Sequence, residues 1–364
     1  MNKEAPKGWN LVNFDSFFTV LPSKKYQVQK QDYLEKGLVP VVDQGQKLII
    51  GYTDDVSKKF NKNNVIIFGD HTRIVKYIDF DFAVGADGTQ ILETKDGIDL
   101  KFGYYQLLNK NIPDTGYNRH FKYVKAKKYV IPPTLAEQQE IVQVLDTMSD
   151  IIRLRKECIS HAQDLIPAIF QEMFGDVIQN KKNINKIKLG KIFILSSGKF
   201  LPAKEMDETG IYPVFGGNGI NGYHNEYLFD EPKLCIGRVG VKCGCVHLTK
   251  PKSWITDNAL YINKLLKSIN IIYLKEALTQ INLNQYAKRA AQPVISQSVI
   301  YNQYILEPPI ELQEQFAQKA IEIEAYIKAQ QEELENAKQM FQSLLHHAFT
   351  GELTRHKFGG DANG

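Results

Sequence analysis

Three residues in the N-terminal half of the chain have the types and spacing found in metal-dependent nucleases. Asp81 precedes the run Glu93-Thr94-Lys95, and an acid followed by Glu-x-Lys can hold Mg²⁺ and activate a water molecule. The chain also contains a second copy of the same architecture, in which Asn263 and Leu265 stand opposite the glutamate and the lysine. Because the second copy lacks the pattern, we interpret it as incidental.

A second group of residues has the chemistry of a zinc site. Cys243, Cys245 and His247 alternate along one face of a predicted strand, with Cys235 nearby, and thiolate and imidazole are the ligands that Zn²⁺ prefers. The matching residues of the first copy cannot form such a site, because they are Val75, Tyr77 and Asp79. We therefore predict a buried strand here and no metal site.

Other catalytic motifs are incomplete. Gly216-Gly217-Asn218-Gly219 resembles a phosphate-cradling loop, but no long helical pattern follows it, so we predict a strand turn. The sequence has no P-loop and no Asn-Pro-Pro-aromatic motif of a methyltransferase, since Ile131-Pro132-Pro133-Thr134 and Glu307-Pro308-Pro309-Ile310 lack the amide and the aromatic ring. We predict that the chain is not an enzyme and binds no cofactor itself.

The strongest regularity of the sequence is a heptad pattern that occurs twice. Apolar residues at alternating steps of four and three run from Ile141 to Met173 and again from Phe316 to Ala348, each with one polar member at the same place, Arg155 and Gln330. Two such seams predict two long antiparallel helices packed as a coiled coil. The central seam residues are Ile141, Leu145, Met148, Ile152, Phe316, Ile323, Ile327 and Leu334.

The ends of these helices are also marked. Thr134 followed by Glu137 forms a capping box, and Gly175 and Gly351 stand where each helix should stop. Pro167 lies inside the first seam, where it should kink the helix or divide it. Because the heptad phase continues past this proline, a kink is the favoured prediction.

The segments between the helices repeat each other more faintly. Residues 37–41 match 210–214, residues 65–70 match 233–238, and Asp87-Gly88 matches Asp257-Asn258. Where the copies differ, the differences are polar: they are His71, Thr72 and Arg73 against Val239, Gly240 and Val241, and Gln44 against Gly216. Short apolar runs separated by Gly, Asn and Asp turns predict strand-rich domains. A repeated scaffold with different polar loops is what a protein would need to read two ligands by one geometry.

The predicted fold is therefore α+β, with an internal pseudo-twofold repeat of two similar strand-rich domains and two long helices. The predicted parts are residues 1–130 (first recognition domain), 131–177 (first helix), 178–306 (second recognition domain), 307–353 (second helix) and 354–364 (flexible tail). No apolar run approaches the roughly 20 residues of a membrane helix. Four cysteines in 364 residues do not form a disulfide framework, so we expect a cytoplasmic protein with no membrane partner.

The distribution of charge is more informative than its net value of +4. From Tyr117 to Val130 basic residues are interleaved with aromatic rings, and no acid occurs before Glu137. Residues 178–204 contain seven lysines and no acid, and shorter basic runs occur at 24–25 and 288–289. High local cation density is characteristic of proteins that bind phosphate backbones.

Double-stranded DNA is the partner that this pattern predicts. Arg, Gln and Asn carry the bidentate groups that identify guanine and adenine edges, while lysines hold phosphates. In the first domain we predict DNA contacts by Gln44, His71, Thr72, Arg73, Arg119 and Lys122. In the second domain the predicted contacts are Lys199, Asn218, Arg238, Lys288, Arg289 and Gln292.

Nearly the whole chain resembles one known family. The run IPPTLAEQQEIVQVLDTMSDIIRLR with LIPAIFQEMFGD, and its second version EPPIELQEQFAQKA with LLHHAFTGEL, are similar to the spacer helices of the specificity subunit of type I restriction-modification enzymes. The segments VVDQG, IIFGDHTR, FAVGADGT, YPVFGGNGINGY, RVG and TDNALY resemble the target recognition domains of that family.

The resemblance implies a function and partners. Each recognition domain would read one half of a split, asymmetric DNA site. The helices would dock two methyltransferase subunits, which bind S-adenosylmethionine and methylate adenine, and a separate restriction subunit would use ATP and Mg²⁺. A helix of about 40 residues spans about 60 Å, which limits the separation of the two readers to about 18 base pairs.

Two other functions fit parts of the sequence. A self-contained nuclease would cleave DNA with Mg²⁺ in a reaction that Glu93→Ala abolishes. A coiled-coil adaptor that binds only proteins would show no salt-sensitive retention on DNA.

Overall fold

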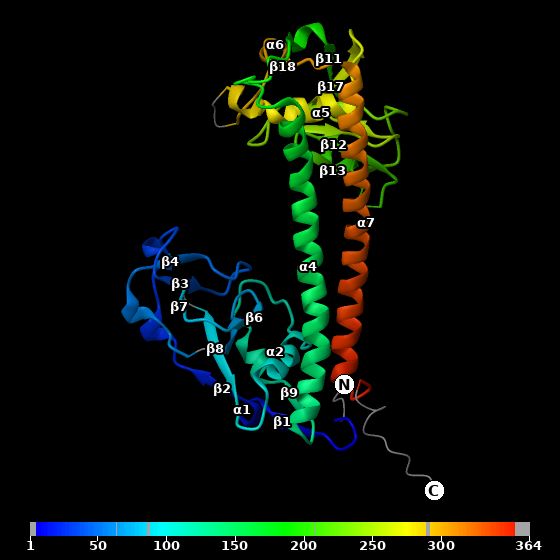
Figure 1. Ribbon diagram of the computed structural model, residues 1–364. Coiled ribbons are helices and arrows are strands. Elements are labelled where there is room, and N and C mark those ends of the chain that lie inside the picture. Colours follow the sequence, from blue (N-terminus) through cyan, green and yellow to red (C-terminus); the bar gives the residue numbers. More distant parts are fainter. Residues whose placement is uncertain (1–4, 63, 86–87, 208, 289–291, 354–364) are drawn as a thin grey trace. The chain divides into compact units, whose positions relative to one another are not determined.

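The computed structural model describes residues 5–62, 64–85, 88–207, 209–288 and 292–353 (Figure 1). It divides into two compact units. Unit 1 comprises Met1–Arg155 and Glu333–Gly364, and unit 2 comprises Lys156–Glu332. The boundaries of both units fall inside the long helices, so that each unit contains one strand-rich domain and a piece of each helix.

Unit 1 is built on a four-stranded sheet of order β2-β8-β5-β6, a three-stranded sheet of order β4-β3-β7 and the pair β1-β9. The strands of unit 1 are β1 (Asn10–Asn13), β2 (Phe18–Leu21), β3 (Val39–Val42), β4 (Gly51–Thr53), β5 (Val65–Gly69), β6 (Val75–Ile78), β7 (Ala83–Val84), β8 (Thr89–Thr94) and β9 (Lys128–Ile131). Its helices are α1 (Phe14–Phe17), α2 (Leu100–Leu108), α3 (Phe121–Lys125) and the first part of α4 (Leu135–Phe174).

Unit 2 repeats this topology, with sheets of order β11-β17-β14-β15 and β13-β12-β16 and the pair β10-β18. The strands of unit 2 are β10 (Lys186–Lys188), β11 (Phe193–Ser197), β12 (Tyr212–Gly216), β13 (Gly219–His224), β14 (Leu234–Gly237), β15 (Val246–Leu248), β16 (Trp254–Ile255), β17 (Ala259–Leu265) and β18 (Tyr304–Leu306). Its helices are α5 (Ile271–Gln280), α6 (Gln297–Tyr301) and the first part of α7 (Ile310–Ala348).

The pairing of strands confirms the predicted repeat and corrects its alignment at one point. Val42 in β3 pairs in parallel with β7, and Phe215 in β12 pairs in the same way with β16. These two residues are therefore equivalent, and Gln44 lies opposite Gly217. The sequence comparison set Gln44 against Gly216, although the offset of the matched residues 37–41 and 210–214 already makes Gly217 its counterpart.

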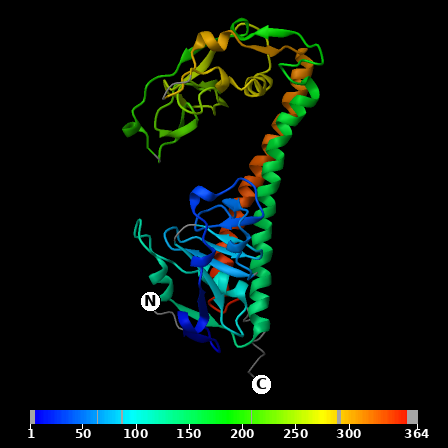
Figure 2. The same cartoon turned by 90° about the vertical axis from the view of Figure 1, so that its left-hand side faces the viewer.

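The two long helices run antiparallel and pack side by side in each unit (Figure 1, Figure 2). In unit 1 the domain core includes Ile141 and Leu145 from the start of α4 and residues 345, 348 and 349 at and just beyond the end of α7. In unit 2 the core includes Phe170 and Phe174 from the end of α4 together with Phe316 from the start of α7. Each domain thus packs on the beginning of one long helix and the end of the other.

The remaining seam residues are less deeply buried. Met148 and Leu334 are buried, whereas Ile152, Ile323 and Ile327 are half-buried. The polar member of the first seam, Arg155, donates to the carboxylate of Glu333 at 3.3 Å, and both residues belong to unit 1.

The ends of α4 follow from local chemistry. The hydroxyl of Thr134 accepts a hydrogen bond from the Glu137 backbone N–H at 3.2 Å, which satisfies one free donor of the first turn. Gly175 stands just past the last residue in the left-handed region, with φ 77°, as expected of a helix stop. The helix continues through Pro167 as one element, so the proline does not divide it.

Candidate nucleic-acid interface

In unit 1 several loops meet at one end of the two larger sheets. They follow β3, β5 and β7, and they are joined by the segment that precedes α3; we call this surface face 1. Backbone hydrogen bonds hold it together: Gly85 N–H donates to Val42 O at 2.7 Å, and Asp70 N–H donates to Gly88 O at 2.8 Å. His120 N–H donates in turn to Asp70 O at 2.8 Å.

Unit 2 builds the same frame from its own loops, which follow β12, β14 and β16 and precede α6; we call this surface face 2. Thr256 N–H donates to Phe215 O at 2.8 Å, and Arg238 N–H donates to Asn258 O at 2.9 Å. Ile295 N–H donates to Arg238 O at 2.9 Å. Each of these bonds is the equivalent of one in face 1, so the two faces share a backbone geometry.

Face 1 brings four of the predicted DNA-contacting residues together. The side-chain oxygen of Gln44 accepts from His71 N–H at 2.9 Å, and the hydroxyl of Thr72 donates to the Gln44 backbone oxygen. The His71 ring stacks on Tyr117, with ring centroids 4.8 Å apart and an interplanar angle of 13°. Tyr117 is 91% exposed and was not among the predicted contacts, although it begins the basic and aromatic stretch that marks this region.

Arg73, the fourth of these residues, is bonded to the protein itself. It adopts a left-handed backbone with φ 63°, and its guanidinium donates to Ile112 O at 3.3 Å and to the Asp114 carboxylate at 2.6 Å. The pKa of Asp114 is lowered from its ordinary value, first because its carboxylate accepts a hydrogen bond from the Gly116 backbone N–H and second because the positive charge of Arg73 lies nearby. The loop that carries Tyr117 is therefore braced from inside the unit.

The cations next to face 1 differ in their surroundings. Arg119 and Lys122 are exposed, and Lys122 lies over the ring of Tyr123 at 5.0 Å. Lys110, which the sequence did not single out, is half-buried, and its ammonium lies over the Tyr129 ring at 4.9 Å. The pKa of Lys110 is lowered to about 8, mainly because burial disfavours the charged ammonium and second because the positive charge of Lys127 lies nearby.

Face 2 gathers its predicted contacts more loosely. Asn218 lies in the turn between β12 and β13, where Gly216 pairs with Gly219, as the predicted strand turn requires. Arg238, Lys288 and Gln292 are exposed on the same group of loops. The Lys199 ammonium lies over the Trp254 ring at 5.4 Å. Arg289 lies outside the described residues.

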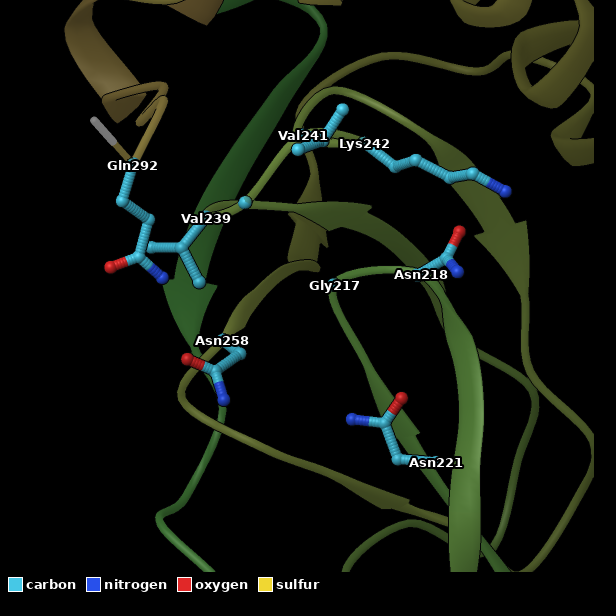
Figure 3. A pocket seen from close by; sticks show the side chains of 9 residues that line it. Gly217, Asn218, Asn221, Val239, Val241, Lys242, Asn258 and Gln292 are labelled. Atoms are coloured by element: carbon cyan, nitrogen blue, oxygen red, sulfur yellow. The ribbon is translucent and has the colours of Figure 1, made fainter. Parts of the chain in front are cut away.

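Face 2 contains a hollow of about 370 Å³. Figure 3 shows Gln292 and Lys242 on opposite sides of it, with Asn221 and Asn258 extending below Gly217. The residues that line it are Gly217, Asn218, Asn221, Val239, Gly240, Val241, Lys242, Asn258 and Gln292. Only Asn218 and Gln292 of these were predicted as contacts, because the others become neighbours only through the sheet topology.

The two acidic residues of the nuclease-like pattern form ion pairs with different lysines. Asp81 pairs with Lys59 at 2.8 Å, and Glu93 pairs with Lys62. Each carboxylate is thus neutralised by its own lysine. Within the described ranges, no three His, Cys, Asp or Glu side chains are grouped in a way that suits a metal ion.

The cysteine segment departs from the predicted alternating strand. Strand β15 begins only at Val246, and Cys243 is buried in the preceding turn, where Gly244 has φ 88°. The turn is pinned by Asn284, whose amide donates to the Cys243 backbone oxygen at 2.8 Å. The strand prediction was therefore wrong for Cys243 and Cys245, because a glycine at positive φ between them interrupts the extended backbone, and only His247 lies in β15.

Two lysines of the basic stretch 178–204 have structural roles. Lys182 donates to Met173 O at 3.2 Å, near the end of α4, where a cation suits the exposed carbonyls. Lys186 donates to Ile178 O at 3.2 Å. These lysines hold the chain at the end of the helix.

Known proteins share both the sequence and the fold. Residues 6–161 and 181–337 each match the family model "Type I restriction modification DNA specificity domain". Two Escherichia coli proteins are similar in sequence: the type I restriction enzyme EcoprrI specificity subunit is 32% identical over 51% of this chain and 50% of its own length. The EcoR124I/EcoR124II specificity subunit is 29% identical over 38% of this chain and 40% of its own. The chain therefore aligns with about half the length of these curated relatives, or less.

Two solved structures share the fold over nearly the whole chain. The S subunit of a type I restriction-modification system from M. genitalium has a TM-score of 0.63 at 18% identity, with 96% of this chain and 97% of that chain covered. A structure solved to explain complex assembly and conformational transition of the type I R-M system has a TM-score of 0.55 at 15% identity, covering 96% and 100%. Among the described residues, no helix is both long and apolar enough to cross a membrane.

Proposed function

Because the chain belongs to the family of type I restriction modification DNA specificity domains, we propose that it is the sequence-specific DNA-binding subunit of a type I restriction-modification complex. In this proposal residues 1–130 and 178–306 are the target recognition domains, and residues 131–177 and 307–353 are the spacer helices. Face 1 and face 2 each read one half of a split, asymmetric DNA site.

One observation carries the proposal: the two faces have the same backbone frame and different side chains. The bond from Asp70 N–H to Gly88 O recurs as the bond from Arg238 N–H to Asn258 O. The next residue along the loop is His71 in face 1 and Val239 in face 2. A protein that docks twice on the same repeating duplex needs one geometry, and a protein that reads two sequences needs two sets of side chains.

On each face, long polar side chains would contact base edges and lysines would contact phosphates. For face 1 these are the predicted residues Gln44, His71, Thr72, Arg73, Arg119 and Lys122, to which we add Tyr117 because of its exposure. For face 2 they are Lys199, Asn218, Arg238, Lys288, Arg289 and Gln292. The internal bonds of Arg73 hold its loop in position and leave its guanidinium partly exposed, with 34% of the side chain accessible.

The partners and chemistry of the complex follow from the same proposal. The paired helices dock two methyltransferase subunits, which bind S-adenosylmethionine and methylate adenine in the cytoplasm. A restriction subunit with ATP and Mg²⁺ supplies translocation and cleavage. The chain itself performs no catalysis. Helix α4 has 40 residues and so is about 60 Å long, which allows the two half-sites to lie within about 18 base pairs of each other.

The proposal is tested by methylome sequencing of the source cells with and without the gene. Loss of one bipartite methylation motif on deletion is the expected result, and an unchanged methylome contradicts the proposal. Purified full-length chain should bind DNA in a salt-dependent manner and should leave it intact in Mg²⁺. Cleavage that Glu93→Ala abolishes would favour a nuclease, and absence of DNA binding would favour a protein adaptor.

A further inference from the structure

We propose that the hollow of face 2 recognises an A·T base pair through its major-groove edge. In this arrangement Asn258 holds the adenine and Val241 contacts the thymine methyl group. The inference rests on the proposed function, since it names the sequence that this one face reads.

The first support is the set of carboxamides around the hollow. Asn218, Asn221 and Asn258 line it together with Gln292, and all four are exposed. Within the part of the chain that the structure describes, none of these amides has a hydrogen-bond partner. A free carboxamide offers one donor and one acceptor side by side, which is the complement of adenine N7 and its 6-amino group.

The second support is an exchange of positions between the two faces. In face 1 a Cβ atom on Gly88 would lie 2.9 Å from the amide nitrogen of Gln44 and 2.9 Å from the His71 ring, so these side chains fill the space. In face 2 the position of Gln44 is taken by Gly217, which has no side chain, and the position of Gly88 is taken by Asn258. The amide is therefore carried by the other loop, and a Cβ atom on Gly217 would lie 3.1 Å from the backbone oxygens of Asn258 and Val239, so glycine fits this position best.

Asn258 is also the best-positioned of the four amides. Its backbone oxygen accepts from Arg238 N–H at 2.9 Å, which fixes the backbone from which the side chain extends. Asn258 is one of the residues that line the hollow, and Figure 3 shows it across from Asn221. A fixed backbone limits the positions that the amide can reach, which favours specific readout.

The third support is the apolar part of the same surface. Val239 and Val241 stand at the positions of His71 and Arg73, and Val241 is 84% exposed. An exposed valine gains nothing from folding, whereas contact with the thymine methyl group removes apolar surface from water. A valine at the position of Arg73 offers the thymine methyl group an apolar contact at a place where face 1 has a cation.

The test uses the full-length chain and a DNA pool in which both half-sites are randomised. We expect one position of the face 2 half-site to be A·T. At that position 7-deazaadenine, which lacks the N7 acceptor, should weaken binding about tenfold, and uracil in place of thymine should weaken it several-fold. Asn258→Ala should abolish the sensitivity to 7-deazaadenine, and Val241→Ala should abolish the sensitivity to uracil.

Asn263→Ala is the matched control, because Asn263 is an exposed asparagine of unit 2 on β17, outside the hollow. It should leave both sensitivities unchanged. A bipartite motif in which Asn258→Ala alters no position, or in which the altered position is G·C, would overturn this inference while the proposed function stands. Absence of any sequence-selective binding would overturn both.

Discussion

The side-chain oxygen of Gln138 in α4 accepts a hydrogen bond from the Asp99 backbone N–H, at 2.8 Å, where α2 begins. The same link recurs in unit 2, where the oxygen of Gln313 in α7 accepts from Asn270 N–H at 3.0 Å, at the start of α5. Both glutamines are buried. One buried amide in the first turns of each long helix therefore adds a polar link to the apolar packing between that helix and its recognition domain.

The first prediction concerns this link. Gln138→Leu removes two hydrogen bonds, the one from the half-buried Asp99 N–H and the one to the carbonyl of Gly97, to which the amide now donates at 3.2 Å. We expect a loss of about 1–3 kcal/mol in the stability of unit 1. Amide hydrogen exchange should show weaker protection in unit 1 and no change in unit 2.

Gln139→Leu is the control for this substitution, because Gln139 is the exposed neighbour of Gln138 on the same helix. It should leave the exchange rates of unit 1 unchanged. If both substitutions had the same small effect, the buried amide would contribute nothing to the attachment of the domain.

The second prediction concerns Lys110. Its pKa is lowered from 10.5 to about 8, chiefly by burial. Between pH 8 and pH 10.5, Lys110 is therefore protonated more often in the unfolded chain than in the folded chain. Stability of unit 1 should therefore rise as the pH increases from 8 to 10.5, and below pH 8 the full cost of the buried charge remains. Lys110→Met should accordingly stabilise unit 1 by about 2 kcal/mol at pH 7.

The advantage of Lys110→Met should shrink as the pH approaches 10. Lys36→Met serves as the control, since Lys36 is exposed in the same unit. Stability curves measured by hydrogen exchange at several pH values compare the two variants. A stabilisation by Lys110→Met that stays constant with pH would show that packing, not charge burial, is responsible.

The third prediction separates two roles of Arg73. If its guanidinium contacts a base, Arg73→Ala should weaken binding about tenfold at the half-site of face 1 and relax the selection of one base. Asp114→Asn leaves the guanidinium in place and should have a much smaller effect on DNA binding. Equal losses from both substitutions would make Arg73 a brace for the Tyr117 loop, and an equal loss on all DNA sequences would make it a phosphate contact.

The residues that the sequence predicted correctly are those whose neighbours are close in sequence or periodic. The seam from Ile141 to Met173 was readable because heptad spacing records which side of a helix is buried. The turn at Asn218 was readable because glycines flank it. The ion pair of Arg73 with Asp114 could not be predicted from the sequence, because the two residues are 41 positions apart and only the sheet topology brings them together.

The hollow of face 2 was also beyond the sequence. It involves Gly217, the counterpart of Gln44, which the comparison of single residues replaced by Gly216. Asn258 was visible only as the counterpart of Gly88, with no sign that it would line a hollow. Such features depend on strand register, which the apolar pattern of short buried strands does not fix.

The fourth prediction tests the spacer. Deleting one whole heptad from each long helix at equivalent places, residues 153–159 and 328–334, keeps the seam in phase and shortens both helices by about 10 Å. The gap between the two recognised half-sites should contract by about three base pairs, while the half-sites themselves stay the same. Deletion of the heptad from α4 alone breaks the pairing of the two long helices and should abolish binding to both half-sites. A gap unchanged by the double deletion contradicts the role of the helices as a spacer.

The most direct test of the central claim is the DNA motif that the full-length chain selects from a random pool. Two separate half-sites at one fixed gap of no more than about 18 base pairs are the predicted result, with Gln44→Ala altering only one half and Asn258→Ala only the other. A single continuous motif, a gap that varies freely between selected sequences, or a change in both halves from either substitution would contradict the account.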